Sequence, residues 1–174
     1  MNPIILLHQN KIRLLLYVSM LLAGFSFSAR AQPPPPRPIA IYVNPAQGLI
    51  FGAFFQGASG GTVAIFPDGS RSVTGSLILA NLGYPYSPAI FSVEANLGTA
   101  ISIMNGPDVT LTGSNGGTIN LHIGTASTGS SFVTSVTPPS QTQVRIGGIL
   151  TVGNALANPS GNYSGTFSVT FIQQ

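Results

Sequence analysis

Apolar and polar residues alternate with period two in short stretches along most of the chain, as β-strands with one buried face require. The alternation is clear over residues 39–43 and near the end, where Phe167, Val169 and Phe171 alternate with serine and threonine. No segment after residue 38 has a helical period. Strands are therefore expected at residues 39–43, 49–55, on both sides of a turn within 60–79, and at 89–94, 100–104, 109–112, 118–123, 132–137, 143–152 and 165–172.

The clearest local signal is GGTVAIFPDGSRSVTGSLIL, residues 60–79. Two apolar alternations flank Pro67, Asp68 and Gly69. Proline presets the backbone of a turn, aspartate bonds back to the chain, and glycine accepts a positive φ. This stretch predicts a β-hairpin.

A glycine pair, Gly147 and Gly148, interrupts the strand pattern of residues 143–152 and predicts either a β-bulge or a close approach of another backbone. Many short strands at regular spacing imply an antiparallel sandwich or barrel. The expected fold is all-β, a single antiparallel immunoglobulin-like (pilin-like) β-sandwich.

The N-terminal region has the composition of a secretory signal peptide. Lys11 and Arg13 precede an apolar run over residues 14–27. That run is shorter than the roughly 20 residues of a membrane-spanning helix, so an uncleaved anchor is the weaker alternative. The expected organisation is a signal peptide over 1–31 cut between Ala31 and Gln32 with Ala29 at the preceding small position, a Pro-rich segment over 32–38, and a β-sandwich domain over 39–174.

Removing the signal peptide changes the charge argument. The whole chain has a formal net charge of +3 and only 5% charged residues. In the remaining 143 residues (174 minus 31) the charges cancel. The charged side chains that stay are Arg37, Arg71 and Arg145 against Asp68, Glu94 and Asp108. The basic charge of the whole chain therefore gives no support for binding to nucleic acid or an anionic membrane, which needs a basic patch, and low net charge favours association between proteins.

Groups for catalysis or metal binding are scarce. After the signal peptide the chain has one histidine, His122, no cysteine and three carboxylates. His122 with Asp68 or Asp108 and a serine could form a triad, but no nucleophile-elbow motif surrounds any serine. His122 is better interpreted as an outward or satisfied residue between Leu121 and Ile123. No catalytic residue, cofactor or metal ligand is therefore expected.

Three stretches, LIFGAF at residues 49–54, the hairpin at 60–79 and RIGGILTVGNALANPSGNYSGTFSVTF at 145–171, together resemble the domain of unknown function 4402 family of secreted bacterial proteins. The resemblance covers residues 39–172. It implies a sandwich similar to pilins and fimbrial adhesins, and it implies no activity. A second likeness is to chaperone–usher pilins, because Gly161 is the fourteenth residue from the end. Gln173 departs from that pattern, which has an aromatic residue there.

An alternating strand at 165–172 leaves an edge that needs a partner, and the strand at 39–43 is the expected one. The predicted strand-pairing interface consists of Ile39, Ile41, Val43, Phe167, Val169 and Phe171. Residues 39–43 either pair within their own chain or are donated to a neighbouring copy. Side-chain burial and ordering entropy nearly cancel in both arrangements, so energetics does not separate them.

The expected function is that of a non-enzymatic exported structural protein, a pilin-like filament subunit or an adhesin module that assembles by β-strand contacts. Its partners are expected to be other copies of itself or related subunits, in the periplasm, at the cell surface or outside the cell. One alternative is a monomeric binding module for carbohydrate or another surface ligand, with Tyr84 and Tyr86 as its aromatic platform. A second alternative is a secreted hydrolase that uses His122.

Overall fold

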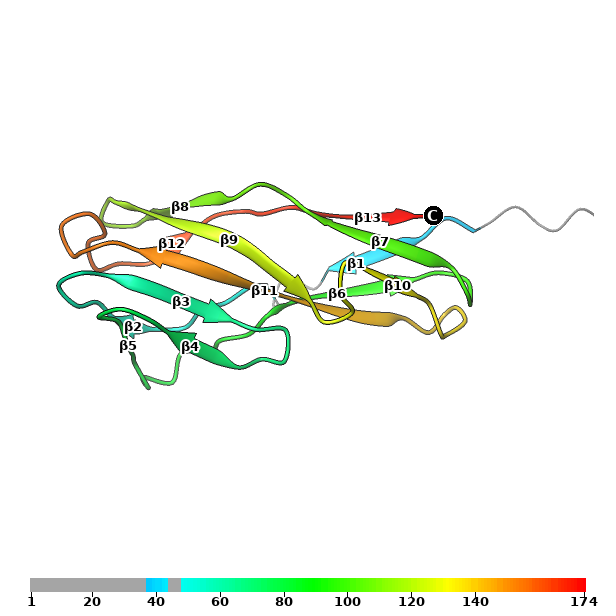
Figure 1. Cartoon of the computed structure of the whole chain (residues 1–174), viewed down its shortest axis with the longest axis horizontal. Coiled ribbons are helices and arrows are strands. Elements are labelled where there is room, and N and C mark those ends of the chain that lie inside the picture. The colour runs from blue at the N-terminus through cyan, green and yellow to red at the C-terminus, as the bar shows by residue number, and fades with distance from the viewer. Residues whose placement is uncertain (1–36, 44–47) are drawn as a thin grey trace, which may run out of the picture. The chain divides into compact units, whose positions relative to one another are not determined.

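The computed structural model describes residues 37–43 and 48–174, and all regular structure in them is β (Figure 1). No helix that could cross a membrane occurs in this part of the chain. The predicted signal-peptide positions Ala29, Ala31 and Gln32 lie outside the described residues. The strands are β1 (Ala40–Val43), β2 (Phe54–Phe55), β3 (Gly61–Ile65), β4 (Arg71–Val73), β5 (Ile78–Leu79), β6 (Ala89–Glu94), β7 (Ala100–Asn105), β8 (Val109–Gly113), β9 (Thr118–Ala126), β10 (Ser131–Val133), β11 (Thr142–Val152), β12 (Tyr163–Ser164) and β13 (Val169–Gln173).

An 8-stranded antiparallel sheet is built around β11. Its order is β1-β6-β11-β9-β8-β12, and β3 joins it by pairing with both β11 and β4. The first half of β11 pairs with β6 and the second half with β3. A 3-stranded sheet has the order β10-β7-β13, and β2 pairs with β5. Every strand pair is antiparallel, as the sequence predicted.

The core lies between the large sheet and the 3-stranded sheet. Alternate residues of the central strands are buried, as in β6, where Ala89, Phe91 and Val93 face inward. Ile101 of β7 is fully buried. Phe171 of β13 packs on Phe91, with ring centroids 5.5 Å apart and the planes tilted by 55°. The two sheets are therefore packed face to face through apolar side chains.

The predicted hairpin is confirmed as β3–β4, with Val63 opposite Val73. The Asp68 carboxylate accepts hydrogen bonds from the Ser70 backbone N–H at 2.8 Å and the Ser70 hydroxyl at 2.6 Å. These two bonds lower the pKa of Asp68. Gly69 adopts a φ of 88°, the left-handed conformation that glycine takes without strain.

The β11–β9 register shifts between Ile146 and Gly148, where β11 advances two residues and β9 three, from Ala126 to Ile123, so the extra residue of this irregularity belongs to β9. A side chain on Gly147 would collide with the backbone oxygen of Ile65. The glycine therefore permits the close approach of β3 to β11.

Three predicted strands have the wrong extent. The strand expected at 165–172 begins only at Val169 and runs to Gln173, where it pairs with β7 in the 3-stranded sheet, while β12 lies before it in the chain and pairs with β8 in the large sheet. The chain changes sheets between the two strands, so the ladder is interrupted there. The strand expected at 49–55 is only Phe54–Phe55, and the one expected at 132–137 is only Ser131–Val133.

Candidate functional site

One edge of β13 is bonded to β7, and two backbone hydrogen bonds fix which residues face that strand. The Gly106 N–H donates to the Ser168 carbonyl at 2.9 Å, and the Gln174 N–H donates to the Ala100 carbonyl at 3.0 Å. Backbone groups of successive residues in an antiparallel strand point to opposite sides. The even-numbered residues from 168 to 174 therefore bond to β7.

The odd-numbered residues Val169, Phe171 and Gln173 consequently direct their N–H and C=O groups to the outer edge. No strand in residues 37–43 or 48–174 pairs with that edge. The side chains of these residues are half-buried, whereas Thr170 and Ile172 between them are exposed. Residues 163–174 contain no charged residue and no proline. The outer edge of β13 is thus a row of open, uncharged backbone donors and acceptors.

The partner of β1 differs from the one expected. β1 pairs with β6, and Ile41 lies opposite Val93. Of the two arrangements that the sequence left open, residues 40–43 pair within their own chain, but with β6 and not with the last strand. β1 pairs with β6 at the end of the large sheet, whereas β13 belongs to the 3-stranded sheet. The outer edge of β1 has no strand partner among the described residues either.

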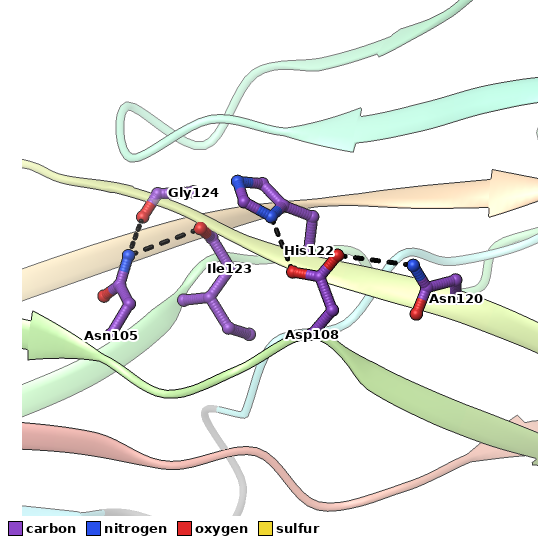
Figure 2. A network of polar contacts seen from close by, with 6 residues as sticks. All are labelled: Asn105, Asp108, Asn120, His122, Ile123 and Gly124. Carbon is purple, nitrogen blue, oxygen red and sulfur yellow. Dashed lines mark hydrogen bonds and ion pairs between the residues drawn. The ribbon is translucent and has the colours of Figure 1, made fainter.

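The open edges of β1 and β13 border the same side of the core. Asn105 of β7 donates to the carbonyl of Gly124 at 2.8 Å and of Ile123 at 3.3 Å, both in β9 (Figure 2). β13 is the neighbour of β7 in the 3-stranded sheet, and it packs on β6 through the rings of Phe171 and Phe91. In the 3-stranded sheet β13 is therefore displaced from β7 in the same direction as β1 is displaced from β9 in the large sheet, where the order runs β9, β11, β6, β1. We call the outer edges of β1 (Ala40–Val43) and β13 (Val169–Gln173) the rim.

His122 and Asp108 meet on the exposed face of the large sheet (Figure 2). His122 Nδ1 lies 2.7 Å from Asp108 Oδ1, and Asn120 donates to Asp108 Oδ2 at 3.4 Å. The two side chains are 63% and 50% exposed. Leu121 and Ile123 on either side are buried, so the interpretation of His122 as an outward, satisfied residue is confirmed. No serine in the described part of the chain hydrogen-bonds to the imidazole, so this contact is the pairing of two solvated groups.

A family model described as Domain of unknown function (DUF4402) matches residues 41–172. The chain belongs to the DUF4402 family. The match confirms the resemblance seen in the hairpin and in the C-terminal stretch. A search of curated proteins and a search of solved structures gave no match.

The predicted strand-pairing residues of this DUF4402 chain lie in or just before β1 of the large sheet and β13 of the 3-stranded sheet. All of them except Val43 pack partly buried against the core, whereas Val43 is 56% exposed. Sequence reasoning missed Gln173, whose backbone also faces the open edge. Gln173 follows Val169 and Phe171 at the same two-residue spacing, and this spacing was the signal in the sequence that could have identified it.

The two tyrosines of the DUF4402 chain that could bind a ligand are both exposed, Tyr84 by 64% and Tyr86 by 47%. The Arg71 guanidinium lies 4.3 Å from the centroid of the Tyr86 ring. Its Nη1 also donates to the Phe51 carbonyl at 2.9 Å. Arg71 thereby links β4 to the segment before β2. The sequence held one weak signal for this role, namely that Arg71 is one of very few charged residues in the chain. No cluster of three or more metal-ligating side chains exists in the residues that the structure describes.

Proposed function

We propose that this DUF4402 protein is a non-enzymatic, exported structural protein, a filament subunit or adhesin module with a pilin-like sandwich that assembles by β-strand contacts. The observation that carries this proposal is the open, uncharged outer edge of β13. Three of its residues present, in one row, backbone groups that no strand of residues 37–43 or 48–174 pairs with.

An open strand edge is a template for another strand. Soluble proteins usually block such edges with lysine, proline, a bulge or a very short strand. Three other edge strands are very short, since β10, β4 and β12 have three residues or fewer, whereas the edge strand β1 has 4 residues. β13 has 5 residues and none of the blocking side chains. The neutral charge of the chain after residue 31 adds no long-range repulsion between copies.

Export is the second part of the proposal. The basic start, apolar run and small residues of segment 1–31 support secretion to the periplasm, the cell surface or the medium. The chain has no cysteine, so the packed core and the strand ladders carry its stability.

Blocking the β13 edge tests the proposal. Val169→Pro with Gln173→Pro removes two outward N–H groups and no bond to β7, because these N–H groups do not face β7. The matched control is Val169→Ala with Gln173→Ala, which loses comparable side-chain contacts but keeps both N–H groups. Light scattering and negative-stain imaging should show association of the native protein and the alanine control, and monomers of the proline variant. Native protein that stays monomeric at every concentration contradicts the proposal.

The exposure of Tyr84 and Tyr86 supports a second candidate, a carbohydrate-binding module. Arg71 fixes the Tyr86 ring from one side, so the ring needs little ordering when it stacks on a sugar. Glycan binding that disappears in a Tyr84→Ala, Tyr86→Ala variant while strand-edge variants leave it unchanged would favour this candidate.

A further inference from the structure

We propose that β13 pairs with β13 of a second copy in an antiparallel ladder centred on Phe171. The inference rests on the proposed function, assembly by strand contacts, and it names the partner and the register. The 3-stranded sheets of two copies then join into one sheet with the order β10-β7-β13-β13-β7-β10. A two-fold axis passes between the two Phe171 residues.

The backbone groups of the open edge are complementary to themselves. In this register Phe171 faces Phe171 of the partner subunit, and Val169 faces Gln173 of the partner subunit. All three of these residues direct N–H and C=O groups outward, as the bonds between β13 and β7 require. Each outward donor therefore meets an outward acceptor, and no open group of β13 is left over.

The side chains of the edge also suit self-pairing. Thr170 lies opposite Ile172 of the partner subunit on the solvent face of the joined sheet, which places two β-branched residues together. Ile172 is 37% exposed, and Met104, on the neighbouring strand, is 60% exposed. Contact with a second copy covers part of this apolar surface. With no charged residue in 163–174, the two-fold axis brings no like charges together.

β1 is a poorer partner for β13, although both edges lie on the rim. β1 has 4 residues, so alternation leaves two of them facing outward against three in β13. A β1–β13 ladder between copies therefore leaves part of the β13 edge open. Self-pairing satisfies the whole edge.

Disulfide trapping tests the register, because the native chain has no cysteine and every disulfide is an engineered one. Opposed residues that do not exchange hydrogen bonds have Cα atoms about 4.5 Å apart, within the range of about 4.4–6.8 Å that a disulfide needs. The full chain is prepared as two single variants, Thr170→Cys and Ile172→Cys. Both substitutions lie on the exposed face and leave the backbone bonds to β7 intact. Val133→Cys on β10, 62% exposed, serves as the control.

The expected result is a covalent dimer when Thr170→Cys and Ile172→Cys are mixed in a thiol–disulfide buffer, and only traces of it in either variant alone or with Val133→Cys. A covalent dimer of Tyr42→Cys with Thr170→Cys, in place of the expected pair, would overturn self-pairing but keep assembly by strand contacts. Association in light scattering without any disulfide between the two β13 variants would also overturn self-pairing of β13 but keep assembly of the protein. Monomers at every concentration would overturn both the self-pairing and the proposed function.

Discussion

The contact between Phe91 and Phe171 places β13 over β6, and a double-mutant cycle measures it. Each phenylalanine is changed to leucine, which removes the ring but keeps an apolar side chain in the core. Phe91 is buried, with 8% of its surface exposed, while Phe171 is half-buried. The ring centroids are 5.5 Å apart and the planes are tilted by 55°, a favourable geometry for an aromatic pair.

The magnitude follows from two terms. A large apolar exchange that nearly conserves volume costs less than about 1.5 kcal/mol in packing. The aromatic pair adds about 0.5–1.5 kcal/mol beyond burial. Each single variant should therefore lose about 1–3 kcal/mol of unfolding free energy. The double variant should lose less than the sum of the two, by about 0.5–1.5 kcal/mol, because the pair can be lost only once.

Urea denaturation of the four proteins, followed by circular dichroism, gives the four free energies and hence the coupling. Phe66→Leu at the β3–β4 turn, where the ring is 45% exposed, provides the control and should show no coupling to Phe91→Leu. Additivity of Phe91→Leu and Phe171→Leu would refute the packing of β13 over β6. The shared rim of β1 and β13 would then lose its basis.

Three further predictions concern the β3–β4 hairpin and Arg71. Gly69→Ala should cost about 1–2 kcal/mol in thermal or urea unfolding, because φ is 88° and no neighbour lies near the new Cβ; Gly69→Asn should cost less. NMR titration should find the pKa of the Asp68 carboxyl below that of an ordinary aspartate, and Ser70→Ala should raise it. Because the folded pKa is lowered, this contribution to stability is present above the unfolded pKa and is lost as pH falls through the folded pKa. Arg71→Leu should lower the unfolding free energy by about 2 kcal/mol, since it removes a charge-assisted hydrogen bond and the contact with Tyr86; unchanged urea midpoints would contradict this role.

Local chemistry made part of the fold predictable from the sequence. The hairpin turn depends on Pro67, Asp68 and Gly69, which act on their immediate neighbours, and it is found as expected. The strand at 89–94 has the predicted bounds, because its alternating apolar residues all face one core. The glycine pair in β11 marked a close backbone approach for a similar reason, since a side chain on Gly147 would collide with the backbone oxygen of Ile65.

The partners of the terminal strands could not be predicted in the same way. An alternating pattern tells which face of a strand is buried but carries no information on which neighbour it bonds. Residues 39–43 and 165–172 have similar patterns, yet β1 joins the large sheet and β13 the other one. The chain passes from the large sheet to the 3-stranded sheet between β12 and β13 because their partners, β8 and β7, themselves lie in these two different sheets. That the outer edge of β13 has no strand partner among the described residues could be established only from the complete set of strand pairings.

Amide hydrogen exchange across β13, measured by NMR as a function of protein concentration, tests the central claim most directly. In dilute protein the amides of residues 170, 172 and 174 should be protected, and those of Val169, Phe171 and Gln173 should exchange fast. Raising the concentration should protect Val169, Phe171 and Gln173 as the edges pair. If these three amides stay fast at every concentration, or are already protected in a dilute monomer, the β13 edge is not the site of assembly.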